Sequence, residues 1–300
     1  KEILQKKITE VIDHLKKSKR PVVIVGGGIR ISKTVKDLSF FLKKINIPIV
    51  TTWSGVDAVT HVTNNYIGNI GVYGSRSANF TIQNSDFVLS LGSRLDTRIT
   101  GGVPKYFARE ATIASVDIDK NELNKNRGLK IKIKINVSLE EFFKAFKKKS
   151  LSLKITKPQW IQKTVSWKRK YPIVLKEYRT QKKYVNPYIF MERLSKHLRK
   201  DDVVVADSGA HLTWAIQSLK VRKKHRLFSA FGNSPMGYAF PAAIGASIAL
   251  NKKKIICIDG DGSIQINIQE LQTLVSNKLP IKIIIINNEG YGIIKQFQEL

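Results

Sequence analysis

Short runs of β-branched and other aliphatic residues recur along this chain, and each run is separated from the next by enough residues to form a helix. In the first half the runs cover residues 22–25, 47–51, 87–91 and 112–117, and in the second half residues 203–206, 227–229, 255–258 and 281–286. Strands that alternate with helices in this way form parallel sheets with crossover helices on their faces. The sequence therefore predicts an α/β protein with two doubly wound parallel sheets.

The alternation of predicted strands and helices, which is interrupted over residues 151–185, divides the chain into three parts. Residues 1–150 form the first predicted domain, which begins with an amphipathic helix over residues 3–15 and ends with a helix capped by Ser138. Residues 151–185 are rich in lysine and contain two prolines, so we expect a linker with some helix in it. Residues 186–300 form the second domain, and Pro187 marks the start of its first helix.

Positive charge dominates the composition. The 300 residues include 52 Lys and Arg against 23 Asp and Glu, a formal net charge of +29. A field of this size attracts nucleic acid or anionic membranes. Only 13 of the 52 basic residues are arginine, the side chain best suited to specific recognition of phosphate and bases, and the lysines are scattered. We expect a solvated surface and neither a nucleic-acid nor a membrane partner; a basic protein that binds nucleic acid or membrane surfaces is the rival hypothesis.

Two further observations narrow the class of protein. The single cysteine, Cys257, excludes an intramolecular disulfide framework and a four-cysteine zinc site. No apolar run approaches the ~18 residues of a membrane span, and the start at Lys1 has neither an initiating methionine nor a signal-peptide core. We expect a cytoplasmic location and a segment of a longer protein.

The strongest chemical signal is an acidic residue between two glycines at the end of one predicted strand and a pair of amides at the end of the next. Asp261 stands in the first motif, and Asn288 follows 27 positions later. In a parallel sheet both strand ends lie at the edge where such folds bind ligands. Carboxylate and amide oxygens suit Mg²⁺. Gly260 and Gly262 allow the backbone to approach a diphosphate closely, and Ser263 can donate a hydrogen bond to it at a helix start.

This pair of motifs resembles the diphosphate and metal signature of thiamine-diphosphate-dependent enzymes, and the chain is most similar to the catalytic subunit of acetohydroxyacid (acetolactate) synthases. The resemblance implies that Asp261, Asn288 and Gly290 bind Mg²⁺. Residues 234–246 resemble the stretch whose methionine, here Met236, wedges under the bent cofactor, with Ser234 beside it. Residues 209–215 are similar to the diphosphate loop, which implies a cofactor role for Gly209 and His211. Ala210 and Leu212 depart from that loop's usual pattern.

The first half resembles the FAD-binding domain of the same synthases. Residues 91–101 are similar to the segment that holds the flavin, which implies that Arg94 and Arg98 lie against it. The glycine turn formed by Gly26, Gly27 and Gly28 and the acidic residue Asp117 also occupy positions that line FAD in the family. Thr97 and Asn136 stand where the synthases usually have acids, so a flavin-free domain is the alternative to FAD.

The last segment resembles the part of the family that closes the substrate pocket. Ile293 would form an apolar wall, and Phe297 replaces the tryptophan that favours a larger acceptor. The resemblance implies decarboxylation of a 2-ketoacid, with pyruvate favoured, and transfer of the two-carbon unit to a second 2-ketoacid, as in branched-chain amino acid biosynthesis. A keto-sugar acceptor and a simple 2-ketoacid decarboxylase are the alternatives.

The same resemblance has consequences for assembly. It implies a homodimer or tetramer, with a regulatory subunit as a further expected partner. It also places the catalytic glutamate in an N-terminal pyrimidine-binding domain that no segment here resembles, so the chain alone is expected to be inactive.

Overall fold

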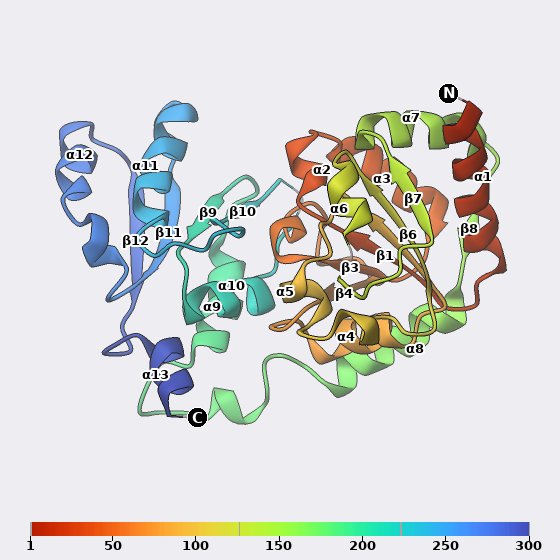
Figure 1. Cartoon of the computed structure of the whole chain (residues 1–300). Helices are drawn as coiled ribbons and strands as arrows, with labels where there is room; N and C mark the ends of the chain where they lie inside the picture. The colour runs from red at the N-terminus through yellow and green to blue at the C-terminus, as the bar shows by residue number, and fades with distance from the viewer. Residues whose placement is uncertain (1, 126, 223, 300) are drawn as a thin grey trace. The chain divides into compact units, whose positions relative to one another are not determined.

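The structure is a computed structural model of the chain, and it describes residues 2–125, 127–222 and 224–299. The chain divides into two compact units, Lys1–Pro172 and Ile173–Leu300 (Figure 1). The division falls within residues 151–185, the segment that the sequence predicts as a linker. Each unit is built around its own parallel sheet, as the strand pattern predicts.

The first unit contains a six-stranded parallel sheet in the order β4-β3-β1-β5-β6-β7. Four of its strands fall where the aliphatic runs predict them, whereas β4 and β7 were not predicted. Their bounds are β1 Pro21–Val25, β3 Ile49–Thr51, β4 Tyr66–Asn69, β5 Phe87–Leu91, β6 Thr112–Asp117 and β7 Ile133–Asn136. A separate pair of short parallel strands joins β2 (Ile45–Asn46) to β8 (Ile155–Thr156).

Helices cover both faces of this sheet, which makes the unit doubly wound (Figure 1). One apolar layer packs α1 (Glu2–Lys17), α3 (Val35–Lys44) and α7 (Leu139–Lys149) against the sheet. The opposite layer contains residues of α4 (Arg76–Gln83), of α5 (Thr97–Thr100) and of the segments that flank α5. The short helices α2 (Gly28–Ile31) and α6 (Lys120–Asn124) follow β1 and β6. The predicted capping box is present: Ser138 Oγ accepts a hydrogen bond from Glu141 N, and the Glu141 carboxylate accepts one from Ser138 N.

Part of the predicted linker packs on the first unit. Helix α8 (Pro158–Lys170) lies against α4. Trp160 is buried, and its indole nitrogen donates to Pro21 O at 3.1 Å. Trp167 meets the ring of Phe80 edge-on. This aromatic face explains why a lysine-rich segment with two prolines folds onto the sheet domain instead of forming an extended connection.

The second unit has a four-stranded parallel sheet in the order β10-β9-β11-β12. Its strands are β9 Val203–Ala206, β10 Arg226–Phe228, β11 Ile255–Gly260 and β12 Ile281–Ile286. Helix α11 (Ala239–Ala249) packs its apolar side against β9 and β11, and α9 (Pro187–His197) and α10 (Ala210–Ser218) pack against each other. The remaining helices are α12 (Glu270–Ser276) and α13 (Gly292–Gln298). Pro187 is the first residue of α9, as predicted, and Asn186 caps it.

The strand order places a switch point beside β9. The chain leaves β9 toward β10 on one side, and later returns to pair β11 with the other side of β9. A crevice forms at the carboxyl ends of the strands on either side of such a reversal, and open α/β sheets bind ligands there. The fold therefore directs attention to the residues that follow β9 and β11.

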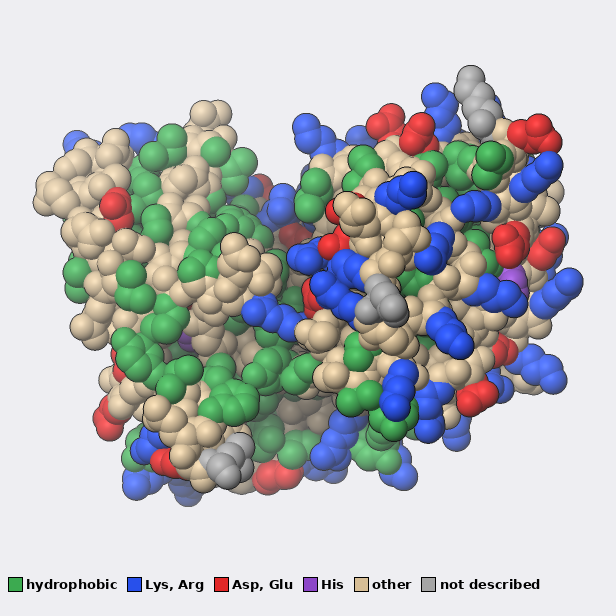
Figure 2. Space-filling view, in the orientation of Figure 1, with side chains coloured by type: hydrophobic (Ala, Val, Ile, Leu, Met, Phe, Trp, Pro, Cys, Tyr) green, Lys and Arg blue, Asp and Glu red, His purple; other side chains and the backbone are tan. Residues whose placement is uncertain are grey.

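No helix among the described residues is long and apolar enough to cross a membrane. On the face shown in Figure 2, the Lys and Arg side chains of the first unit are dispersed among other side chains. The second unit exposes several large apolar side chains, among them Val275 on α12 and Ile285 on β12.

Candidate functional site

A pocket of about 270 Å³ opens at the carboxyl edge of the second sheet. Its walls come from the loop after β9, from the segment before α11, from the loop after β11 and from the segment after β12. The pocket brings together most of the residues that the sequence predicts for the cofactor, the metal and the substrate wall: Gly209, His211, Ser234, Met236, Gly260, Asp261, Gly262, Ser263, Asn288, Gly290 and Ile293.

The three predicted metal residues meet one another directly. Asp261 Oδ2 accepts a hydrogen bond from Gly290 N at 3.1 Å. One terminal atom of the Asn288 amide lies 2.9 Å from Gly290 O and 3.1 Å from Asp261 Oδ1. With nitrogen in that position, the amide donates a hydrogen bond to both oxygens. With oxygen in that position, the amide oxygen of Asn288 lies close to both Gly290 O and Asp261 Oδ1.

The spacing of these oxygens fits a small hard cation. Mg²⁺ binds oxygen at about 2.1 Å in octahedral geometry, so neighbouring ligand oxygens lie about 3 Å apart. The separations of 2.9 and 3.1 Å at Asn288 match that value. Carboxylate, amide and backbone carbonyl oxygens are also the ligand types that Mg²⁺ prefers. This donor set therefore fits Mg²⁺.

His211 lies in the first turn of α10, in the wall of the pocket. Burial lowers the pKa of its imidazole to about 4, against the opposing effect of a hydrogen bond to the Asp207 backbone. Its Nε2 is buried and has no partner among the residues that the structure describes, so the ring bonds to Asp207 through Nδ1. A neutral ring with its proton on Nδ1 presents a lone pair at Nε2. Donation to a phosphate oxygen then requires a second proton on the ring.

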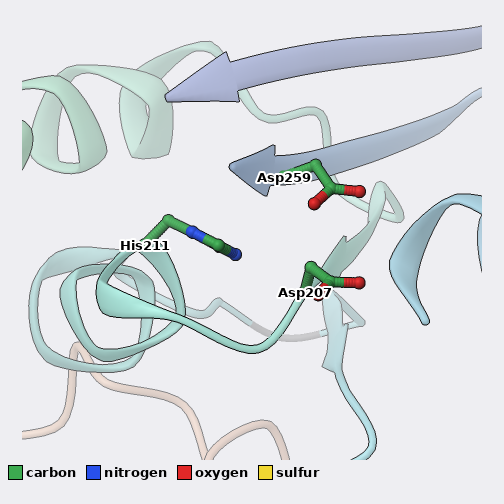
Figure 3. Close-up of side chains that lie close together, drawn as sticks. All are labelled: Asp207, His211 and Asp259. Carbon is green, nitrogen blue, oxygen red and sulfur yellow. The ribbon is translucent and has the colours of Figure 1, made fainter. Parts of the chain in front are cut away.

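Two buried carboxylates lie next to this imidazole, and Figure 3 shows the His211 ring directed toward them. Candidate ligand atoms of Asp207, His211 and Asp259 lie within 4.8 Å of one another, close enough to hold a metal ion. Asp259 Oδ1 accepts hydrogen bonds from Gly260 N and from the Ser263 hydroxyl. Asp259 Oδ2 has no partner in the described part of the chain. Burial raises the pKa of Asp259 to about 6, opposed by the Ser263 hydrogen bond.

Asp207 differs from Asp259 because backbone groups occupy both of its carboxylate oxygens. Oδ1 accepts from Ser208 N at 2.7 Å and from Gly237 N at 3.1 Å, and Oδ2 accepts from Ala239 N at 2.6 Å. A carboxylate bonded in this way has little capacity left for a metal. Burial raises the pKa of Asp207, and the backbone hydrogen bonds oppose that effect.

Comparison with known families decides the identity of the fold. The family model described as the thiamine pyrophosphate enzyme central domain matches residues 8–145. The model of the C-terminal TPP binding domain of the same enzymes matches residues 207–300, which include the whole pocket. The chain belongs to the thiamine pyrophosphate enzymes. The first unit thus corresponds to their central domain and the second to their cofactor-binding domain.

Individual thiamine pyrophosphate enzymes agree with this assignment. The acetolactate synthase large subunit of Cyanidium caldarium is 36% identical over 288 residues, which are 95% of this chain and 48% of the relative. The large subunit from Lactococcus lactis is 32% identical, over 97% of this chain and 50% of the relative. The acetolactate synthase isozyme 2 large subunit of Escherichia coli is 31% identical, over 95% of this chain and 50% of the relative. The chain spans about half the length of the curated relatives it matches.

The residues predicted to bind flavin lie at one edge of the first sheet. β1 and β5 are neighbours, so the turn after β1, with Gly26, Gly27 and Gly28, packs against the loop after β5 that carries Arg94. Arg94 is paired with Glu122 at 3.1 Å. Asp117 ends the next strand, β6, and Arg98 is exposed on α5.

Packing alone explains the first of these glycines. A Cβ at Gly26 would lie 2.1 Å from the carbonyl oxygen of Gly92. The backbone of the β1 turn could not approach the loop after β5 with any side chain there. Gly26 is therefore no independent argument for a flavin.

Two predicted residues of the second unit are placed differently from what their predicted roles require. Phe297 does not line the pocket; it lies on α13 with 68% of its surface exposed. Ser263 lines the pocket, but its hydroxyl proton is donated to Asp259. The sequence reasoning did not single out Asp207 or Tyr291. Asp207 follows a predicted strand directly, a signal that could have found it, whereas Tyr291 in the pocket wall had no signal beyond its place in the last motif.

Proposed function

We propose that this chain is part of a thiamine-diphosphate- and Mg²⁺-dependent enzyme. In this proposal the enzyme decarboxylates a 2-ketoacid, with pyruvate favoured, and transfers the two-carbon unit to a second 2-ketoacid. The observation that carries the proposal is that the Asp261 carboxylate, the Asn288 amide and the Gly290 backbone meet in a pocket that also contains His211 and Met236. The relatives named acetolactate synthase support this choice of reaction.

The residues predicted to bind the metal, the diphosphate and the cofactor rings each have a task in this proposal. Asp261 and Asn288, with the backbone of Gly290, would hold Mg²⁺ against a diphosphate. The amino end of α10, with Gly209 and His211, would face the same anion, where the helix dipole stabilises negative charge. Met236, which is 36% exposed in the pocket wall, would support the rings of the cofactor. The cofactor itself supplies the electron sink that stabilises a carbanion after loss of CO₂.

The metal assignment is tested with Asp261→Asn. The change removes the negative charge but preserves the shape of the side chain, so binding of thiamine diphosphate should weaken strongly and require more Mg²⁺. Glu289→Gln is the matched control, because it removes an exposed acid from the neighbouring loop, between Asn288 and Gly290. Calorimetric titration at a series of Mg²⁺ concentrations measures both variants. Equal affinity in Asp261→Asn and the wild type would refute the assignment.

The reaction is tested by product analysis with pyruvate as the sole substrate. The complete gene product is incubated with Mg²⁺, thiamine diphosphate and FAD. Acetolactate is the expected product. Release of CO₂ without acetolactate would instead support a simple decarboxylase or an acceptor such as a keto-sugar. Binding of the cofactor with pyruvate left intact would show that the donor is a different 2-ketoacid.

We also propose that FAD binds at the carboxyl edge of the first sheet. Support comes from Arg94 and Arg98, two exposed guanidinium groups at the edge where β1, β5 and β6 end, since such groups suit a diphosphate. After incubation with FAD and gel filtration, the protein should retain flavin absorbance, and Arg94→Ala should reduce it. Arg20→Ala, at the opposite end of β1, is the control. A colourless wild-type protein would favour the flavin-free alternative.

A further proposal concerns assembly. The matched relatives are named large subunits, which indicates that those proteins have partner subunits. We expect the complete protein to form homodimers or tetramers and to bind a smaller regulatory subunit. Sedimentation of the purified protein, alone and with a co-expressed small subunit, tests this expectation; a monomer under both conditions would contradict it.

A further inference from the structure

We propose that Asp207 is a positioning residue that joins the diphosphate loop to the loop carrying Met236. This inference rests on the proposed binding of thiamine diphosphate in the second unit. The geometry that carries it is a fully buried carboxylate that bonds to backbone on both sides of the pocket at once. No catalytic role is assigned to Asp207, because it does not line the pocket.

The contacts of Asp207 begin in the sheet. The residue follows β9 directly, and its backbone N–H donates to Ile258 O of β11 at 2.9 Å. Its carboxylate is 0% exposed and accepts from Ser208 N, the residue that leads into the diphosphate loop. β9 and β11, the strands on either side of the switch point, thus fix the backbone of Asp207, and with it the position of the carboxylate.

The other contacts of the carboxylate hold the Met236 segment. Gly237 N, the group that follows Met236 in the chain, donates to Oδ1, and Ala239 N donates to Oδ2. Ala239 is the first residue of α11, where a negative charge is stabilised by the helix dipole. On the other side, the Asn267 amide donates to Gly237 O at 2.7 Å. The backbone next to Met236 is therefore held from two directions.

This arrangement couples the two halves of the cofactor site. Ser208 and Gly209 lead to His211, on the side that would face the diphosphate, whereas Met236 would face the rings. Both segments take their position from one side chain, and hydrogen bonds to an ionised carboxylate are among the stronger ones in proteins. A shift of this carboxylate would move the ring support relative to the diphosphate site.

The alternative is that Asp207 only stabilises the fold, and Asp207→Asn distinguishes the two. The amide replaces one acceptor oxygen with an NH₂ group that faces a backbone N–H, so the bond to Gly237 or to Ala239 is lost. Asp202→Asn is the matched control. Asp202 is also buried, next to the other end of β9, and it accepts from Arg199 N, far along the strand from the pocket.

The measurement is a double-mutant cycle with Met236→Ala in the complete gene product, read as the affinity for thiamine diphosphate by calorimetry at saturating Mg²⁺. Asp207→Asn should weaken binding by about tenfold or more, the effect of losing a hydrogen bond to a charged group. Met236→Ala should then lower the affinity for thiamine diphosphate much less in the Asp207→Asn protein than in the wild type. Additive effects would overturn the proposal, since uncoupled residues contribute independently.

Two further measurements keep the test decisive. Asp202→Asn should lower thermal stability and leave the full cost of Met236→Ala in place. If Asp207→Asn does not fold, Asn267→Ala takes its place in the cycle, because it removes the other bond at Gly237; additive effects there would also overturn the proposal. If the complete wild-type gene product binds no thiamine diphosphate, the proposed function is refuted, whereas binding with an additive cycle would refute only the role of Asp207.

Discussion

When the second unit unfolds, a proton passes from the buried carboxyl group of Asp259 to the imidazole of His211. In the folded chain the pKa of His211 is about 4 and that of Asp259 about 6, against ordinary values of 6.5 and 3.8. Burial is the main cause of both shifts. Near pH 5 the folded pair therefore holds its proton on Asp259, and the unfolded pair holds its proton on the histidine. Because both states bind the same number of protons, the pair contributes almost no pH dependence to stability.

Asp259→Asn should expose the effect of the histidine alone. The amide keeps an acceptor for Gly260 N and does not titrate. Between pH 6.5 and pH 4 the unfolded chain then binds more protons at position 211, so the free energy of unfolding should fall as the pH is lowered. The two pKa values of His211 differ by about 2.5, which corresponds to about 3 kcal/mol.

His211→Gln should give the opposite slope. Only Asp259 then titrates, and its folded pKa lies above its unfolded value, so the folded chain binds more protons between pH 3.8 and about 6. The free energy of unfolding should fall as the pH rises through this range, again by about 3 kcal/mol. Glu289→Gln, which removes an exposed acid, serves as the control and should follow the wild type.

Cys257 reports this unfolding specifically. It is the single cysteine of the chain, it is buried in β11, and it lies two residues before Asp259. Its reaction with 4,4′-dithiodipyridine, which labels thiols in acid, is followed in urea at a series of pH values in cofactor-free protein. Parallel pH profiles for the wild type, Asp259→Asn and His211→Gln would refute the reasoning, because they would show that the pair does not exchange a proton.

Three further results are expected. A Cβ at Gly262 would lie 2.4 Å from Tyr291 Cε1, so Gly262→Ala should weaken Mg²⁺-dependent cofactor binding about fivefold or more, and Tyr291→Ala in the same chain should restore it. Failure of the second change to restore binding would contradict the steric explanation. Ser138→Ala removes the capping box of α7 and should cost about 1 kcal/mol in urea unfolding. Gly26→Ala should destabilise the first unit by about 2 kcal/mol or more, whereas Gly102→Ala, where a Cβ meets nothing within 4 Å, should have a small effect on the same unfolding curve.

The sequence predicted the sheets because most of their strands contain a run of apolar residues. β1, β5 and β11 are buried along their whole length, and such strands stand out as continuous aliphatic runs. β4 and β7 lack this signal. β4 contains a glycine and an asparagine, and β7 alternates isoleucine with lysine and asparagine at the edge of the sheet. Pairing with a neighbouring strand makes these segments β-structure, and pairing is a property of the folded chain.

The role of Asp207 could not be read from the chain for a related reason. Three of its bonds are made to backbone N–H groups, two of them about thirty residues away in the sequence. Any residue type supplies such a donor, so the partners of the carboxylate leave no trace in their side chains. An acid directly after a buried strand signals only that something must compensate the charge. The structure is needed to show that the compensation comes from the segment next to Met236.

Asp261 and Asn288 illustrate what strand register adds to a motif. β11 and β12 pair in parallel, with Gly260 opposite Ile286, so the residues after both strand ends leave the sheet at the same level. The contact between Asp261 and Asn288 therefore depends on the register of β11 and β12. Their separation of 27 in the sequence only has to be long enough for the connection between the two strands. The same logic brings the turn after β1 to the loop after β5, where Val25 pairs with Leu91. Residues that closely follow β9, β11 and β12 come together in the pocket, whereas Phe297, at the far end of the helix after β12, lies outside it.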